Sequence, residues 1–220
     1  IEPLAKPRDR FDDADAGFRY SAFVEGWDLT FNYLYHYDDF PVTRVNRTPP
    51  VVALSRRYER SHLVGGTAAK PYGDYVIRLE YGLSTDRYFP AFTPTGVARS
   101  DEFSSVVGLD WSGLTDTFVS FQFFQSSALD KNSTFRRPLT EMNASLLVRR
   151  NWMNETLTTE AIVIHGLSGQ GALLQAKAKI DYWTNVQLEL FADFFEGEPQ
   201  DLFGQFDDRD RAGVEITVSL

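Results

Sequence analysis

The sequence predicts an all-β protein, an antiparallel up-and-down transmembrane β-barrel. Three observations lead to this prediction. Apolar and polar residues alternate over several long segments, as they do in strands with one lipid-facing side. Short turns and long loops alternate between these segments, and no convincing helical period occurs. Aromatic residues make up 15% of the chain, which favours β structure and the rim of a membrane barrel.

The clearest alternation covers residues 27–37. One face carries the apolar and aromatic side chains Trp27, Leu29, Phe31, Tyr33, Tyr35 and Tyr37, and the other face is mostly polar. At about 3.3 Å per residue, a strand of this length crosses a bilayer when it is tilted. An ordinary strand has about 5–6 residues. We therefore expect the aromatic face of this strand to contact lipid or the membrane interface.

The same period predicts ten further strands. Clear alternation covers about 75–84, 103–112, 119–123, 174–182, 186–194 and 212–220, and weaker alternation covers about 18–25, 51–69, 144–152 and 157–165. The total of about eleven strands is odd, whereas bacterial single-chain barrels have even numbers of strands. We therefore expect residues 17–220 to be the strand region of a larger, even-stranded barrel, and residues 1–16 to be a lead-in, periplasmic or loop segment.

The connections between the predicted strands alternate in length. Short turns are expected at 25–26, 72–74, 113–116, 153–156 and 184–185, and long loops at 38–50, 84–101, 126–143 and 196–211, with a shorter loop at 166–171. A barrel with a tight periplasmic rim and an elaborate outer rim has this arrangement. A sandwich with Greek-key connections has no reason to keep it.

The composition excludes several classes of protein. The chain has no Cys, which removes disulfide scaffolds, thiolate metal sites and Cys nucleophiles. A formal charge of −9 argues against nucleic acid as a partner, because such partners need a basic surface. No apolar run is long enough for a transmembrane helix. Because the chain begins at Ile1 without an initiator Met or a leader, we expect that a signal peptide has been removed or that an N-terminal part is missing.

Two groups of motifs resemble a known family. The first is GLDWSG at 108–113, followed by FQFFQ at 121–125; the second is FEGEP at 195–199 with FGQFDDRDR at 203–211 before the last strand. Together they resemble the C-terminal portion of proteobacterial outer-membrane barrels, notably an uncharacterised porin-like family found beside RND exporters, and more loosely the alginate-export porins. The resemblance implies an outer-membrane location and transport of lipid-like or hydrophobic substrates, and it supplies no catalytic residues.

The polar face of the predicted strands carries full charges. The candidate lumen-lining residues are Asp28, Arg78, Glu80, Asp110, Arg149, Lys177, Lys179, Glu189 and Asp193. In a water-filled lumen such side chains set ion selectivity and the field that a solute meets. The alternative is a wall of solvated or mutually paired charges that binds no ligand. Because the turn at 184–185 folds two strands into a hairpin, we expect the two lysines to lie beside Glu189 and Asp193.

The remaining motifs give little support to an enzyme or a metal site. Asp207, Asp208 and Asp210 cluster in the last long loop and are weak candidates for a divalent cation, but salt bridges to Arg209 and Arg211 are the favoured interpretation. His36, His62 and His165 lack the spacing of metal ligands. No G-x-S-x-G motif appears. We expect no catalytic activity and no cofactor.

The sequence therefore predicts a channel of the bacterial outer membrane that passes or binds a small or hydrophobic solute through a polar lumen. Two alternatives stay open: an outer-membrane enzyme of the lipase or protease type, and a soluble ligand-binding β-barrel or structural module. The expected partners are outer-membrane lipid, an unidentified solute, and other subunits or a missing N-terminal part of the barrel, with no nucleic acid.

Overall fold

The computed structural model describes residues 13–48, 51–131, 134–169, 171–199 and 201–219. This part of the chain is all-β apart from short 3₁₀ segments. The strands are β1 (Ala16–Val24), β2 (Trp27–Tyr37), β3 (Val42–Thr48), β4 (Val51–Arg57), β5 (Arg60–Tyr72), β6 (Tyr75–Pro90), β7 (Val97–Trp111), β8 (Thr117–Ala128), β9 (Thr140–Trp152), β10 (Leu157–Gly166), β11 (Ala172–Trp183), β12 (Val186–Glu196) and β13 (Arg211–Val218), and the 3₁₀ helix is η2 (Gly204–Arg209). Among these residues, no helix has the length and hydrophobicity needed to cross a membrane.

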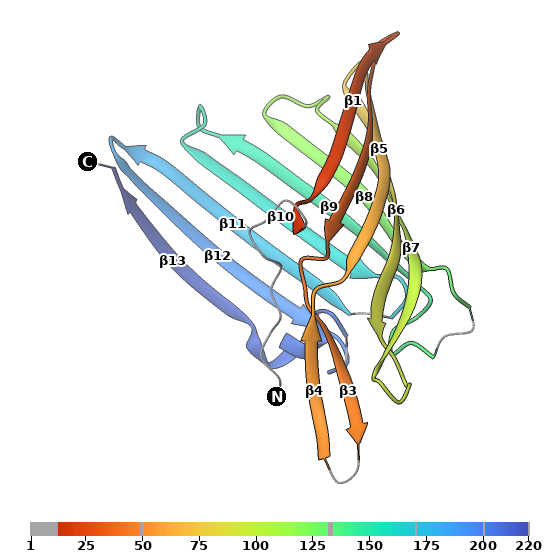
Figure 1. The fold of residues 1–220 in the computed structure, drawn as a ribbon. Helices are drawn as coiled ribbons and strands as arrows, with labels where there is room; N and C mark the ends of the chain where they lie inside the picture. Colours follow the sequence, from red (N-terminus) through yellow and green to blue (C-terminus); the bar gives the residue numbers. More distant parts are fainter. Residues whose placement is uncertain (1–12, 49–50, 132–133, 170, 200, 220) are drawn as a thin grey trace. The chain divides into compact units, whose positions relative to one another are not determined.

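Eleven of the strands form one antiparallel up-and-down sheet. Its order is β1-β2-β5-β6-β7-β8-β9-β10-β11-β12-β13, so that each strand pairs with the next one of the sheet along the chain (Figure 1). This confirms the predicted all-β class and the predicted up-and-down order. The sheet order begins at β1 and ends at β13, and within the described residues these two strands are edges of an open sheet and not neighbours in a closed barrel.

The chain divides into two compact units. Unit 1 consists of residues 1–69, 79–105 and 125–141, and unit 2 consists of residues 70–78, 106–124 and 142–220. Unit 1 contains β1 to β4 entirely, and unit 2 contains β10 to β13 entirely. Most of the segment predicted as a lead-in at 1–16 lies outside the described residues, and β1 begins at Ala16.

The prediction of one strand over 51–69 is wrong. The structure contains two strands there, because β4 pairs with β3 in a separate two-stranded sheet, whereas β5 joins the main sheet beside β2. The backbone N–H of Asp38 donates to the carbonyl oxygen of Glu59 at 2.9 Å, so the two ends of the β3–β4 hairpin meet where it leaves the sheet. Strand β3 therefore occupies most of the segment predicted as a loop at 38–50.

The prediction of a long loop at 84–101 is also wrong. Strand β6 continues to Pro90 and β7 starts at Val97, which leaves only residues 91–96 between them. The alternation breaks at Asp86, whose φ is 62°, a left-handed conformation that non-glycine residues seldom adopt. Its backbone N–H donates to Oδ1 of Asp101 at 3.0 Å. Because of this irregularity, a strict alternation of apolar and polar residues does not predict this part of the strand.

The two faces of the sheet have the reverse of the burial found in soluble proteins. In unit 2, exposed apolar side chains share one face, here called the apolar face; Val107, Phe121, Val148, Val163, Leu174, Leu190 and Val214 are each at least 40% exposed. On the opposite face, Asp110 is 5% exposed and Asp193 is 1% exposed. A soluble sheet would bury the first group and solvate the second.

Unit 1 has the same reversal. Tyr20 is 66% exposed and Tyr81 is 50% exposed, whereas the polar side chains of Ser61 and Ser100 are 1% and 4% exposed. The ring of Tyr81 packs against the neighbouring strand: a Cβ added to Gly66 would lie 3.1 Å from the Cε1 atom of Tyr81. This exposed ring therefore leaves no room for a side chain at Gly66.

Candidate functional site

The face of unit 2 opposite the apolar face carries acidic and basic side chains and is here called the charged face. Residues paired across an antiparallel ladder point to the same side of a sheet. Arg149 pairs with Glu160, and Glu160 pairs with Lys177. Lys179 pairs with Glu189, which in turn pairs with Glu215. The charged side chains of β9 to β13 therefore form one continuous set on this face.

Ion pairs connect neighbouring strands of the charged face. Nε of Arg149 lies 2.8 Å from Oε2 of Glu160, and Nζ of Lys177 lies 3.7 Å from Oε1 of Glu189. The expected contact between Lys177 and the next strand is confirmed. Lys179 lies opposite Glu189 in the register, but its ion pair, at 3.3 Å, is with Asp181 of its own strand.

Asp193 is the most deeply buried charge of the charged face. Its Oδ1 accepts a hydrogen bond from Nε2 of Gln175 at 2.7 Å, and its Oδ2 accepts one from Nε of Arg211 at 2.6 Å. Arg211 thus pairs with the strand before the last loop and not with the acidic residues of that loop, which corrects the prediction. The pairing ties the edge strand β13 to β12 and β11.

Two further lumen-lining candidates lie in the parts of the strands β6 and β7 that belong to unit 2. Arg78 of β6 forms an ion pair with Asp110 of β7. Gly108 lies between this pair and β8, because a Cβ added there would be 3.6 Å from Cβ of Arg78 and 3.7 Å from Cγ of Gln122. The absence of a side chain at 108 leaves room for the long arginine to lie along the sheet.

The remaining two candidates, Asp28 and Glu80, belong to unit 1 and are exposed. In the part of the chain that the structure describes, neither one forms an ion pair. Asp28 shares its face with Thr30, whose hydroxyl lies 2.8 Å from that of Thr67. The structure therefore places these two acids in the sheet as predicted but does not join them to a charged cluster.

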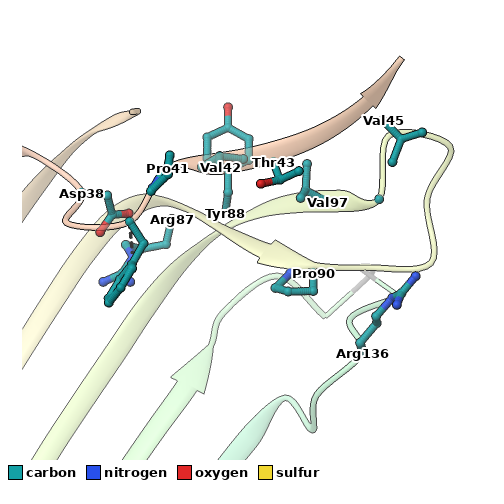
Figure 2. Close-up of a pocket in the computed structure, with 12 residues that line it drawn as sticks. Asp38, Pro41, Val42, Thr43, Val45, Arg87, Tyr88, Pro90, Val97 and Arg136 are labelled. Atoms are coloured by element: carbon teal, nitrogen blue, oxygen red, sulfur yellow. Dashed lines mark ion pairs between the residues drawn. The ribbon is translucent and has the colours of Figure 1, made fainter. Parts of the chain in front are cut away.

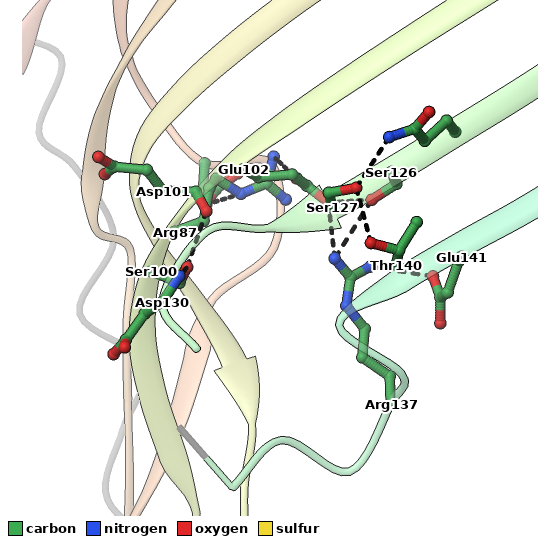
Figure 3. A network of polar contacts seen from close by, with 12 residues as sticks. Arg87, Ser100, Asp101, Glu102, Ser126, Ser127, Asp130, Arg137, Thr140 and Glu141 are labelled. Atoms are coloured by element: carbon green, nitrogen blue, oxygen red, sulfur yellow. Dashed lines mark hydrogen bonds and ion pairs between the residues drawn. The ribbon is translucent and has the colours of Figure 1, made fainter. Parts of the chain in front are cut away.

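Sequence reasoning missed a polar network in unit 1 (Figure 3). Glu102 of β7 is its centre: Oε1 accepts hydrogen bonds from Nη2 of Arg137 at 3.1 Å and from Oγ of Ser126 at 2.6 Å. Oε2 lies 3.5 Å from Nη1 of Arg87. Arg137 also donates to Glu141 at 3.0 Å. Two arginines from different strands and loops thus share one carboxylate that is 12% exposed.

Arg87 extends the network toward the first long connection. Its Nε lies 3.1 Å from Oδ2 of Asp38, which directly follows β2. Burial is the larger influence on Asp38 and raises the pKa of its carboxyl, while the nearby Arg87 opposes this rise. Arg87 is six residues after Tyr81 in β6, so regular alternation would place both side chains on the apolar face. The left-handed Asp86 between them interrupts the alternation and lets Arg87 reach Glu102.

Apolar residues also occur on the charged face of unit 2. Leu147, Ile162, Ile164 and Leu173 are half-buried there, and the register places Leu147 opposite Ile162 and Ile164 opposite Leu173. Leu173 pairs in turn with Phe195 of β12. The ring of Phe206 in η2 lies 5.6 Å from that of Phe195, measured between centroids, so the last loop packs against the end of β12.

The acidic cluster of the last loop shows no arrangement for a metal. Asp207 and Asp208 are exposed in η2, and Oδ1 of Asp210 accepts a hydrogen bond from the backbone N–H of Phe195 at 2.8 Å. Among the described residues, no group of three or more His, Asp or Glu side chains is placed to hold a metal ion.

Comparisons with protein-family models, curated proteins and solved structures found no match to this chain.

Proposed function

We propose that this chain is part of an outer-membrane β-barrel channel, in which the apolar face contacts lipid and the charged face lines a hydrated path for solutes. One observation carries the proposal: within each unit, large apolar side chains of one face are exposed, whereas polar side chains such as Ser61, Asp110 and Asp193 of the opposite face are buried. Exposed apolar surface of this extent marks a membrane or protein interface. Outward apolar and inward polar alternation is the pattern of transmembrane barrels.

The position of the cations on the apolar face supports a bilayer as the partner. Arg150 lies on this face near the end of β9, with its guanidinium 4.0 Å from the ring centroid of Trp152. In unit 1, Arg60 lies at the first position of β5 and stacks on Tyr37 at 4.0 Å. Aromatic rings with cations at strand ends are suited to the polar boundary of a membrane.

The charged face supports a water-filled path. A cation on the lipid face costs about 2–4 kcal/mol near the bilayer midplane, whereas it costs little in a hydrated lumen. Lys177, which is paired with Glu189, lies in the middle of the twelve-residue strand β11, where a cation on the lipid side would be costly. The apolar patch around Ile162 and Leu173 would accommodate the hydrophobic part of a solute, in keeping with the porin-like family that the motifs resemble.

Further strands would complete the barrel. In β13, Val214 and Ile216 are 64% and 65% exposed, more than Leu190 of the neighbouring strand at 41%, because β13 has a neighbour on one side only. Another part of the same protein or other subunits would supply the missing neighbours, as the odd strand number of the sheet suggests.

Membrane insertion of matched variants tests the proposal. Ala176 and Gln175 are adjacent near the middle of β11 and belong to the apolar and the charged face. We expect Ala176→Arg to reduce stable insertion into phosphatidylcholine vesicles, by about 2–4 kcal/mol, and Gln175→Arg to be tolerated. Insertion would be measured by protection from protease and by quenching of Trp152 with brominated lipid. Equal tolerance of both variants, or quenching of Trp152 by aqueous iodide alone, would contradict the membrane assignment.

A further inference from the structure

Unit 1 contains a cavity of about 430 Å³ that the proposed channel does not use. It lies between β3 and the connection from β6 to β7 (Figure 2). The backbone N–H of Val45 donates to the carbonyl oxygen of Thr95 at 2.8 Å, which holds β3 against this connection. Gly96 lines the cavity, and a Cβ added to it would lie 3.4 Å from Cγ2 of Val45. The volume is in the range of sites for small organic ligands.

The walls of the cavity are mostly apolar. They are formed by Pro41, Val42, Val45, Pro90 and Val97, with the aromatic residues Phe40 and Tyr88. Val42 is 9% exposed, so this wall is part of a packed layer, whereas Phe40 is 82% exposed. A ligand with an apolar or aromatic body would therefore bury its surface against these walls and could be covered by the Phe40 ring.

The charges around the cavity are not balanced. Arg87 is paired with Asp38 at 3.1 Å, and Arg44, which stacks on Tyr88, is paired with Glu59 at 2.8 Å. Arg136 differs: in the described part of the chain its guanidinium has no carboxylate partner and lies 5.1 Å from the ring centroid of Phe92. Figure 2 shows the Asp38–Arg87 pair and Arg136 at opposite ends of the lining residues.

We propose that this cavity binds a small organic anion, with its apolar or aromatic body against Val42, Val97 and Pro90 and its acid group on Arg136. A guanidinium binds a carboxylate through two parallel hydrogen bonds, which makes the contact directional as well as charged. Asp38 stands at the other end and favours the orientation in which the acid group faces Arg136. The binding does not depend on conduction, so failure of the channel proposal would leave this one intact.

Fluorine NMR on the full chain in octyl glucoside tests the site. The probe is 4-fluorobenzoate, and the neutral comparison is 4-fluorobenzamide. We expect saturable broadening of the benzoate signal and about tenfold weaker binding of the benzamide, because a charge-assisted contact contributes more than a neutral one. Arg136→Gln should weaken benzoate binding to the level of the benzamide. Arg19→Gln, at an exposed position of β1 outside the cavity, is the matched control and should leave the affinity unchanged.

A second variant locates the site. Thr43 is exposed and lines the cavity, so Thr43→Trp should fill the cavity and abolish binding of both probes without affecting folding, which circular dichroism would verify. Equal affinity for benzoate and benzamide would overturn the proposal. Unchanged binding in Arg136→Gln or in Thr43→Trp would overturn it as well.

Discussion

The ring of Phe191 covers Gly213 on the charged face of the sheet. The two residues are direct partners in the ladder between β12 and β13, and a Cβ at 213 would collide with the Phe191 ring. An aromatic side chain over a glycine of an edge strand protects the glycine backbone and fixes the register. The contact therefore holds β13 in the position where Arg211 reaches Asp193.

We expect Gly213→Val to lower the free energy of unfolding by about 1–3 kcal/mol, because the added side chain must displace the Phe191 ring. Urea unfolding in detergent, followed by tryptophan fluorescence, would measure the change. Ala212→Val is the matched control, since Ala212 is exposed on the opposite face and has room for the larger side chain. A cost for Ala212→Val equal to that for Gly213→Val would show that the contact with Phe191 is not the cause.

Reversal of charge at Lys177 and Lys179 should change ion preference more than stability. Their side chains are 38% and 40% exposed, and partly exposed ion pairs contribute about 0–1 kcal/mol. We expect the double substitution Lys177→Glu and Lys179→Glu to fold normally and to shift the reversal potential of bilayer currents toward cation selectivity. Arg47→Glu, at an exposed position of β3, is the control. Loss of folding with unchanged selectivity would assign the lysines a structural role.

The sheet could be predicted where the sequence repeats with a strict period of two. The hairpin of β11 and β12 shows this: unbroken alternation and a short turn predict that Lys177 lies near Glu189, and the structure has them 3.7 Å apart. The β3–β4 hairpin could not be predicted in this way. Arg56, Tyr58, Arg60 and His62 share one parity although they belong to two different sheets or to the link between them, so alternation alone does not reveal the break.

The network around Glu102 could not be predicted for a different reason. Arg137 lies 35 residues from Glu102 in the sequence, in a segment that is predicted to be a loop. Only the pairing of β7, β8 and β9 brings Arg137 close to Glu102. Arg87 has the parity of the apolar face and changes sides because of Asp86. The signal that could have indicated the network is the concentration of arginine and acidic residues in segments without clear alternation.

We expect Glu102→Gln to lower the free energy of unfolding by about 2 kcal/mol, since two arginines would lose their common carboxylate. Hydrogen exchange at residues 134–139 should become faster in this variant, because Arg137 would be held less firmly. Glu215→Gln is the matched control: Glu215 is exposed and lies opposite the like charge of Glu189, so its neutralisation should be harmless or stabilising. A neutral result for Glu102→Gln would show that the network does not contribute to stability.

Removal of the Phe206 ring should loosen the last loop. The ring pair with Phe195 contributes about 1 kcal/mol beyond its buried area. We expect Phe206→Ala to accelerate hydrogen exchange in η2 and to increase the fluctuations of single-channel current, because this segment packs at the end of β12. Leu202→Ala, in the same loop and 57% exposed, should change neither. Faster hydrogen exchange without any change in current would show that the last loop does not affect the path of the solute.

The carboxyl of Asp38 makes the stability of the fold depend on pH. Burial raises the pKa of its carboxyl above the ordinary value of 3.8, and the pairing with Arg87 lowers it less than burial raises it. A carboxyl whose pKa is raised by folding stabilises the folded state most below pH 3.8, where it is protonated in both the folded and the unfolded state. This contribution is lost as the pH rises through the higher pKa of the folded state. Asp38→Asn has no such titration.

The difference in unfolding free energy between the native chain and Asp38→Asn should therefore fall as the pH rises from below 3.8 through the raised pKa, and then stay constant. Urea unfolding of both proteins at a series of pH values would measure it. Asp39→Asn removes the same charge from the exposed neighbouring position and controls for the general change in net charge. If the difference rose with pH instead, the pairing with Arg87 would outweigh the burial of Asp38, and the carboxylate would be a stabilising anchor of the first long connection.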